Sequence, residues 1–191
     1  MNFELLQQVC GSLVRLNDQE WERFKTAFSS RKVNKKTLLV KSGQICKEIY
    51  FINKGLLRLF YDKEDLEITA FIFKEGLFAT SYDSFLKQSP GIQNLEAIED
   101  SELLVISFDE LNKLYEEIPA MHIFTRKMAE QRFINAQNIL SSFILDSPET
   151  RYYKFEKEHP DLLLRVPHHL IASFLGITPV SMSRIRARKK S

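Results

Sequence analysis

Basic and hydroxyl side chains gather near the C-terminal end of the chain, between Val166 and Lys190. An arginine can donate two parallel hydrogen bonds to the edge of a guanine base, and lysines and other arginines bind phosphate. From Leu162 onwards there is no aspartate or glutamate to compete for these cations. These residue types predict contact with DNA. The candidate DNA-binding residues are His168, His169, Thr178, Pro179, Val180, Ser181, Ser183, Arg184, Arg186, Arg188 and Lys189.

Two short helices joined by a tight turn are expected to position these side chains. Gly176 can adopt the positive φ of a sharp helix–helix turn, Thr178 is placed to cap the second helix, and Pro179 suits its first position. Apolar residues recur at helical spacing on both sides of the turn, at Ile171, Ala172, Leu175, Met182 and Ile185. This is the pattern of a helix-turn-helix, whose second helix enters the DNA major groove. A solvated basic tail behind a helical hairpin would explain the charge, but the turn, cap and apolar spacing favour DNA binding.

Composition and charge distribution are those of a soluble globular protein with one basic end. The 191 residues are 44% hydrophobic and 27% charged, with a formal net charge of +2. The stretch from Glu96 to Glu117 is strongly acidic, so the charge is unevenly distributed. The N-terminus does not resemble a signal peptide, no apolar run approaches membrane-spanning length, and two isolated cysteines suit a reducing compartment. We therefore expect a cytoplasmic protein without membrane contact.

The middle of the chain is rich in short β-type runs separated by turn residues. Hairpin turns are predicted at Asn53–Gly55 and at Asp62–Asp65. The candidate strands are 37–40, 49–52, 56–61, 66–73, 95–98 and 103–106. Closely spaced short strands favour a sandwich, barrel or roll, and with the flanking helices they predict an α+β fold.

Capping patterns place helices on both sides of this β-rich region. Asn17 with Glu20, and Ser107 with Glu110, match the capping box, and the second predicted helix ends near Glu117. A long helix is predicted from Pro119 to about Leu145, followed by a hinge at Asp146-Ser147-Pro148, a helix over 149–159, and a stop at Pro160-Asp161.

Apolar residues fall on two faces of the predicted long helix. One face carries Ala129, Phe133, Ala136, Leu140 and Phe143, and another carries Phe124, Met128 and Ile139. The helix is therefore either a core helix of a single subunit, or one that packs on the β-rich region and pairs with its twin. The candidate dimerisation residues are Phe124, Met128, Phe133, Ala136, Leu140 and Phe143.

Two motifs resemble the Crp/Fnr family of bacterial transcription regulators. IASFLGITPVSMSRIR is similar to the family's helix-turn-helix, and Lys41, Gly43, Tyr50, Phe51, Ile52, Gly55, Leu56 and Arg58 follow its β-roll pattern. The resemblance implies a jelly-roll sensor over 1–117, a dimerisation helix over 118–146, and a DNA-binding domain of winged-helix type over 147–191. It also implies a non-enzymatic homodimer that binds operator DNA and contacts RNA polymerase.

The resemblance assigns roles within the helix-turn-helix. Arg184 matches the family's recognition-helix arginine, for which we expect a contact to guanine. Pro179 and Val180 stand where well-known members carry Arg and Glu, so the target sequence is expected to differ. Because the sequence ends soon after this helix, we expect the final elements of longer members to be absent.

The residues that bind cyclic nucleotides in the family are missing. Gly91 stands where the family's phosphate-binding Arg is expected, with Ile92 and Gln93 in place of Ser-Ala, and Thr80-Ser81 replace its Gly-Glu. Since a buried phosphate needs cationic donors, cyclic AMP is not expected to bind in the usual mode. Aromatic residues either line a ligand pocket or simply fill the roll. The candidate pocket residues are Phe73, Phe78, Thr80, Ser81, Tyr82, Phe85, Gly91, Ile92 and Gln93.

No metal or cofactor is expected. Cys10 and Cys46 are too few for an iron–sulfur cluster, and none of the four histidines falls on a predicted strand. The sequence does not identify the effector. Two other functions remain open. One is a ligand sensor that acts on a partner protein and has a vestigial DNA-binding domain. The other is a cupin-like enzyme, although this sequence lacks the His and Glu metal ligands that such an enzyme carries on its strands.

Overall fold

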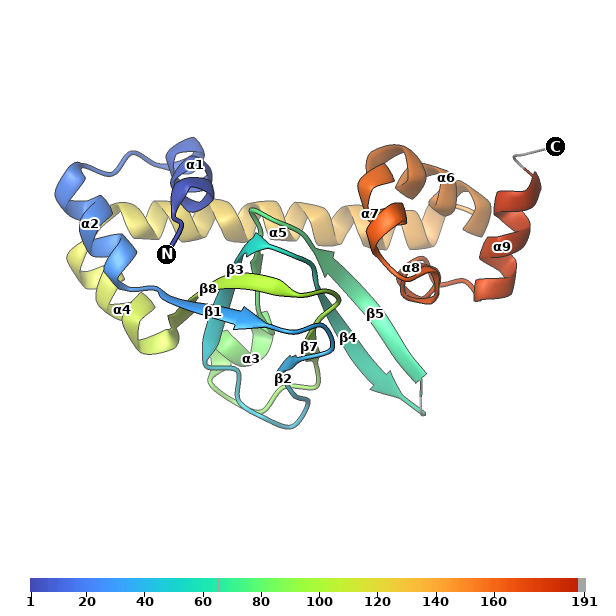
Figure 1. Ribbon diagram of the computed structural model, residues 1–191, viewed down its shortest axis with the longest axis horizontal. Helices are drawn as coiled ribbons and strands as arrows, with labels where there is room; N and C mark the ends of the chain where they lie inside the picture. The colour runs from blue at the N-terminus through green and yellow to red at the C-terminus, as the bar shows by residue number, and fades with distance from the viewer. Residues whose placement is uncertain (65, 189–191) are drawn as a thin grey trace.

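A long helix runs along the molecule and connects its two halves. The computed structural model describes residues 1–64 and 66–188, so that Lys189, assigned above to DNA binding, lies outside the described residues. Helix α5 (Ala120–Leu145) spans the view, with two sheets packed against its middle and helices at both ends (Figure 1). None of the helices in the described ranges has the length and apolar character needed to cross a membrane.

Two short helices open the chain. They are α1 (Glu4–Leu13) and α2 (Asp18–Thr26). The predicted capping box is confirmed: Asn17 Oδ1 accepts a hydrogen bond from Glu20 N at 2.9 Å, and Glu20 Oε2 accepts one from Asn17 N at 2.9 Å. Phe24 of α2 is buried and contacts the Phe124 ring of α5 edge to face, which fixes the N-terminal helices against the long helix.

Two antiparallel four-stranded sheets form a β-roll that encloses the main core, so the α+β fold class is confirmed. One sheet has the order β1 (Ser29–Val33), β8 (Ser101–Ser107), β3 (Glu48–Lys54) and β6 (Phe78–Ala79). The other has the order β2 (Leu38–Val40), β7 (Asn94–Ala97), β4 (Leu57–Lys63) and β5 (Leu66–Phe73). Strands β1 and β6 were not predicted, because β1 is an edge strand of mostly exposed polar residues and β6 has only two residues.

The predicted turns form, and one of them requires glycine. Gly55 has φ +105°, and a Cβ there would lie 2.8 Å from Cα of Ser101, so no larger residue fits. The β4–β5 hairpin pairs Lys63 with Leu66, as expected for the turn at 62–65, although residue 65 itself lies outside the described part.

Two further helices occur in the chain before α5, one between β6 and β7 and one after β8. They are α3 (Tyr82–Lys87), which was not predicted, and α4 (Phe108–Glu117). Half of the predicted capping box at the start of α4 is present, since Ser107 Oγ accepts a hydrogen bond from Glu110 N at 3.2 Å. The Glu110 carboxylate accepts hydrogen bonds from Lys113 and Arg23, whose cationic groups attract it more strongly than a backbone N–H.

The C-terminal part is helical throughout the described residues. Its elements are α6 (Pro148–Glu158), α7 (Pro160–Arg165), α8 (His168–Phe174) and α9 (Pro179–Arg188). Pro160 was predicted to stop the preceding helix, and α6 does end at Glu158. The same proline also occupies the first position of α7, where a missing N–H costs nothing. No strand of a wing occurs among residues 108–188.

The C-terminal helices pack directly on the β-roll. Leu56 and Ile98 from the roll are buried in the same cluster as Ile171 of α8. Ser173 Oγ accepts a hydrogen bond from Thr69 N at 2.9 Å and donates one to the Glu67 carbonyl at 3.0 Å. Strand β5 therefore contacts the helix-turn-helix through its backbone.

Two sets of ion pairs connect α7 with the turn after β5. Arg165 bonds Glu75 through Nη1 at 3.0 Å and Nη2 at 2.6 Å, and it also bonds Glu99. Lys74 pairs with Asp161 at 3.2 Å, where both side chains are more than 40% exposed. Burial alone would raise the pKa of Glu75, but hydrogen bonds from Arg165 and from Gly55 N outweigh burial and lower it from 4.5 to about 2.

Replacing Arg165 with methionine is expected to lower the free energy of unfolding by about 2 kcal/mol at pH 7. The reason is that Glu75 and Glu99 would then face each other without their shared cation. Because the folded-state pKa of Glu75 is depressed, its contribution is complete above pH 4.5 and is lost as the pH falls through about 2. The difference between wild type and Arg165→Met, measured by urea unfolding, should therefore shrink as the pH falls from 4.5 and approach zero below about pH 2.

The matched control is Lys74→Met, which removes the more exposed pair between the same two segments. This change is expected to cost at most about 0.5 kcal/mol, since solvated pairs contribute little. Equal costs for the two variants, or a pH-independent cost for Arg165→Met, would contradict the role assigned to Arg165.

Candidate DNA-binding surface and ligand pocket

The turn of the helix-turn-helix has the geometry that its sequence predicts. Gly176 has φ +64°, its N–H donates to the Ser173 carbonyl at 3.0 Å, and Ile177 N donates to the Ala172 carbonyl at 3.0 Å. This is the Schellman arrangement that ends a helix with a left-handed glycine. Thr178 Oγ1 then accepts a hydrogen bond from Ser181 N at 3.1 Å, so the predicted cap of α9 is also present.

Helix α9 turns one face inward and the other to solvent. Met182 and Ile185 are buried against α6 and α8, as the apolar spacing predicts. On the outer face, Val180 is 60% exposed, and Arg184 and Arg188 are exposed as well. Thr178, Pro179 and Ser183 are exposed, and Ser181 is half-buried. The outer face of α9 is therefore open to solvent.

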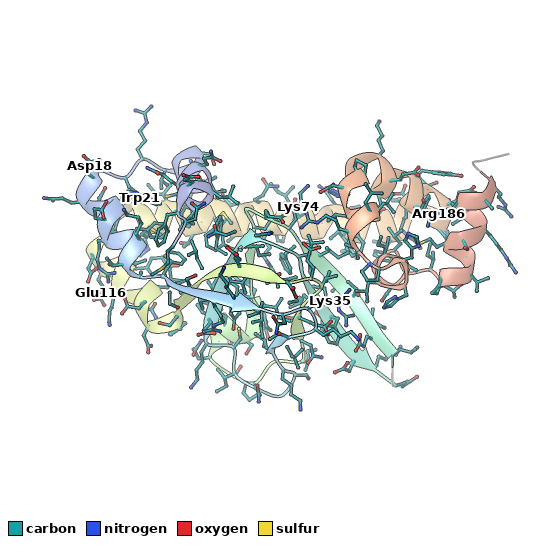
Figure 2. All side chains as sticks on the ribbon, in the orientation of Figure 1. Asp18, Trp21, Lys35, Lys74, Glu116 and Arg186 are labelled. Atoms are coloured by element: carbon teal, nitrogen blue, oxygen red, sulfur yellow. The ribbon has the colours of Figure 1, made fainter. Side chains whose placement is uncertain are left out.

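Histidines on α8 lie beside the end of α9. The Arg186 guanidinium approaches the His168 ring, with its Nη1 3.0 Å from Nε2. Figure 2 labels Arg186 at the C-terminal end of the molecule, far from Trp21 and Asp18 at the opposite end. His169 is exposed in the first turn of α8. The structure therefore brings His168 and Arg186 together, whereas Arg184 and Arg188 extend from α9 with no ion pair recorded within 1–64 and 66–188.

Arg151 of α6 links the long helix to the helix-turn-helix, and the sequence analysis missed it. Its Nε donates to the Leu175 carbonyl at the end of α8, and its Nη1 donates to the Asp146 carbonyl at the end of α5, both at 2.9 Å. The guanidinium also lies over the Phe143 ring, 4.8 Å from its centroid. A cation that satisfies two helix C-termini stabilises both ends. Its sequence signal was weak, since one arginine in a polar helix normally faces water.

The candidate dimerisation residues divide between the two sides of α5. Phe124 is buried and Met128 is half-buried against the β-roll, so both belong to the subunit's own packing. Phe133 is 64% exposed and Leu140 is 54% exposed, and Phe143 is also largely exposed, while Ala136 is half-buried. Further exposed apolar residues of α5, not singled out from the sequence, are Ile123, Ile134, Ile144 and Leu145.

A pocket of about 210 Å³ lies between the β-roll, the N-terminal helices and α5. It has mainly apolar walls from α2, α4 and α5, together with strand β5 and helix α3. Five of the candidate pocket residues line it: Phe73, Phe78, Thr80, Tyr82 and Phe85.

The other four candidate pocket residues lie outside this pocket. Ser81 Oγ donates to Gln93 Oε1 at 2.8 Å, and Gln93 Nε2 donates to the Tyr61 hydroxyl at 2.6 Å. A Cβ on Gly91 would lie 2.8 Å from Cβ of Ser84, and Ile92 is 74% exposed. The backbone at Gly91 therefore leaves no room for a side chain.

A single arginine faces the pocket from the long helix. Arg132 lies over the rings of Phe71, Phe73 and Tyr82, with its guanidinium carbon 5.3, 5.2 and 5.5 Å from their centroids. Burial lowers the pKa of Arg132, because its charged form is removed from water. The sequence analysis missed this residue. The sequence does contain a signal for Arg132: it follows Met128 by four positions, so it lies on the face of α5 that packs against the β-roll.

The described residues offer no ready site for a metal. Within 1–64 and 66–188 no group of three or more His, Cys, Asp or Glu side chains is close enough to hold an ion. Cys10 and Cys46 are buried free thiols, and burial raises the pKa of Cys10 to about 11, which makes it unreactive.

Comparison with known proteins identifies the fold. Residues 30–117 match the family described as the cyclic nucleotide-binding domain. The structure of CLP from Xanthomonas campestris, described as a c-di-GMP-responsive global regulator, has 16% identity and a TM-score of 0.73, covering 91% of this chain and 92% of that chain. FixK2 from Bradyrhizobium japonicum has 14% identity and a TM-score of 0.75, with coverage of 84% and 83%.

A third structure, a Crp/Fnr-family transcriptional regulator from Eubacterium rectale, has 18% identity and a TM-score of 0.71, with coverage of 92% and 84%. The chain has the Crp/Fnr fold. The resemblance noted in its sequence motifs is thus confirmed at the level of the fold. No curated protein matches the chain in sequence.

Proposed function

We propose that the protein is a homodimeric transcription regulator of Crp/Fnr type that binds operator DNA through α9. In this proposal residues 1–117 form a sensor, 118–146 the dimerisation helix, and 147–191 the DNA-binding domain. The observation that carries it is the exposed outer face of α9, which bears Arg184 and Arg188 on a correctly capped helix-turn-helix. The protein would act in the cytoplasm together with RNA polymerase, and without enzymatic activity.

The side chains of α9 suit different kinds of DNA contact. Arg184 lies in the middle of the exposed face, where a guanidinium reaches base edges, and we assign it a bidentate contact to guanine. Arg188 lies at the end of the helix, nearer the phosphate backbone, and we assign it and Lys189 to phosphate. Arg186 contacts His168, so this pair would bind phosphate jointly. Thr178, Ser181 and Ser183, near the N-terminus of α9, supply further polar contacts.

We further propose that the sensor does not bind cyclic AMP in the family's usual mode. The packing of Gly91 against Ser84 supports this, because an arginine at that position would displace the helix that carries Ser84. The hydrogen bond between Ser81 and Gln93 also uses groups that a ribose would need.

The first experiment is to select genomic fragments with the purified full-length protein at about 0.15 M salt. Recovery of a palindromic motif is the expected result, since two recognition helices related by a two-fold axis read inverted half-sites. If only random fragments are recovered, with and without cell metabolites, a sensor that acts on a partner protein becomes the better interpretation.

Replacing Arg184 with alanine is expected to weaken binding to the selected operator by about 10- to 100-fold, the effect of losing one bidentate base contact. Binding to a scrambled sequence should weaken by no more than about threefold, because that binding depends on phosphate contacts. Fluorescence anisotropy titrations on both DNAs at several salt concentrations provide the measurement.

Arg188→Ala is the matched control, on the same exposed face but placed at the phosphate backbone. It should weaken binding to both DNAs by similar factors and reduce the salt dependence by about one ion. Equal losses on operator and scrambled DNA for Arg184→Ala would rule out a base-reading role for that residue.

A further inference from the structure

Arg132 is a half-buried cation that has aromatic neighbours but no acid beside it. Within 1–64 and 66–188 no carboxylate is recorded within ion-pair distance of its guanidinium. Withdrawing a cation from water carries a desolvation cost, and cation–π contacts offset part of it. The three rings, however, provide no oxygen that accepts the guanidinium N–H hydrogen bonds. An anion placed beside the guanidinium would provide such acceptors.

Arg58 is a buried arginine that this chain pairs with acids elsewhere. It also lies on an aromatic ring, with its guanidinium carbon 4.0 Å from the centroid of Phe60. Unlike Arg132, it pairs with two carboxylates, those of Glu96 and Glu67. Arg151, which is also buried over a ring, has no acid but donates to two main-chain carbonyls. Arg132 differs from both, since its guanidinium has neither an acid nor a carbonyl partner among residues 1–64 and 66–188.

The remainder of the pocket suits an apolar molecule. Its walls are mostly aromatic and aliphatic, and include Phe24, Phe28, Met121, Phe124 and Met128. Among its polar lining groups, Thr80 already donates its hydroxyl to the Glu48 carbonyl at 2.9 Å. A cavity of roughly 150 Å³ holds a benzene ring in a protein. The 210 Å³ here therefore accommodates one ring or a short alkyl chain together with a small head group.

We propose that this pocket binds a small carboxylic acid with an apolar body, such as an arylalkanoic or medium-chain alkanoic acid. The carboxylate accepts two hydrogen bonds from Arg132, and the body lies among Phe24, Phe28 and Phe124. This proposal rests on the proposed function, because it names the class of effector to which the proposed sensor would respond. It does not depend on the place where the family holds cyclic phosphates, since Gly91 and Gln93 lie outside the pocket.

Strand β5 contacts both the pocket and helix α8, so it could transmit the effect of a bound acid to the helix-turn-helix. Phe71, Ile72 and Phe73 of this strand line the pocket, and Ile72 also packs against the cluster that contains Leu56 and Ile171. Two residues further back, Thr69 donates its backbone N–H to Ser173 of α8. A ligand that moves the two rings would therefore also bias the contact between the roll and the helix-turn-helix.

Binding can be measured on the full-length protein through its single tryptophan. Trp21 contacts the Phe24 ring, 5.8 Å between centroids, and Phe24 lines the pocket, so ligand binding should change Trp21 fluorescence. The probes are 3-phenylpropionate and octanoate, compared with 3-phenylpropionamide and octanamide, which have the same shape without the charge. The acids are expected to bind at least tenfold more tightly than the amides, with calorimetry as a second readout.

The decisive variant is Arg132→Met, which keeps the length and apolar stem of the side chain and removes its charge. It should weaken acid binding at least tenfold and leave amide binding unchanged. Its melting temperature without ligand should equal or exceed that of wild type, because an unpaired enclosed cation has been removed. The matched control is Arg126→Met on α5, where Arg126 is exposed and pairs with Glu130; acid binding should not change.

Two results would overturn the proposal. One is equal binding of acids and amides, or unchanged acid binding in Arg132→Met, because the pocket would then be merely apolar. The other is tight binding of cyclic AMP or cyclic di-GMP with no response to either acid. The proposed function is tested separately by the selection of operator DNA. Acid binding without any change in operator affinity would support the pocket and remove its sensor role. Operator binding without acid binding would support the proposed function and overturn the proposed ligand.

Discussion

Replacing Phe133 and Leu140 together with glutamate is expected to produce a folded monomer that binds operator DNA at least 100-fold more weakly. The two residues lie seven positions apart on α5, hence on one face of the helix, and are 64% and 54% exposed in the single chain. Ile144, 71% exposed, continues the same face one turn further. A row of large apolar side chains on a long helix is characteristic of a surface covered by a second chain.

The loss of affinity follows from valency. In a dimer, the second recognition helix binds at the high local concentration set by the first, and this raises affinity by factors of about 10² to 10⁴. Four introduced carboxylates at one dimer interface repel each other and remove that gain. Sedimentation at micromolar protein concentration gives the oligomeric state, and anisotropy gives the affinity.

Ile92→Glu is the control for a charge introduced at an exposed apolar residue. Ile92 is 74% exposed on the β-roll, away from α5, and its replacement should change neither the oligomeric state nor the DNA affinity. A double variant at Phe133 and Leu140 that remains dimeric would show that the subunits pair through another surface.

Local patterns in the sequence predict this fold well where each element carries its own signals. The capping box at Asn17, the long helix and the turn at Gly176 all form as expected, because their determinants lie within a few residues. Strand β1 was missed because its sequence, SSRKV, has no apolar alternation; it is held by pairing with β8, which the sequence does not reveal. Helix α7 was missed because proline signals both a stop and a start.

The candidate DNA-binding surface and the pocket could be predicted from the sequence to different extents. The candidate DNA-binding surface lies in one continuous stretch, so the exposed face of α9 could be predicted from the spacing of its apolar residues. The pocket is assembled from α2, α3, α4, α5 and β5, and its residues are far apart in the chain. Arg132 became a candidate only once the structure showed which face of α5 packs against the β-roll. Likewise, only the structure shows that Gly91 and Ile92 do not line this pocket.

Replacing Gly176 with alanine is expected to destabilise the DNA-binding domain by about 2–4 kcal/mol. A non-glycine residue at φ +64° costs about 1–2 kcal/mol, and the new Cβ would lie 2.6 Å from Cε1 of Phe143. The Phe143 ring must then move, although it is held beneath the Arg151 guanidinium, which bonds the ends of both α5 and α8. Hydrogen exchange of α8 and α9 should report the loss, and operator binding should weaken with it.

Gly43→Ala isolates the backbone part of this effect. Gly43 has φ +84°, but a Cβ there meets no atom within 4 Å, so its replacement should cost only about 1 kcal/mol. Removing the ring in the double variant Gly176→Ala, Phe143→Ala should restore part of the stability that Gly176→Ala loses. Equal costs at Gly43 and Gly176, without rescue, would mean that Phe143 moves aside freely. In that case, Arg151 and the backbone alone would connect the end of the long helix to the recognition helix.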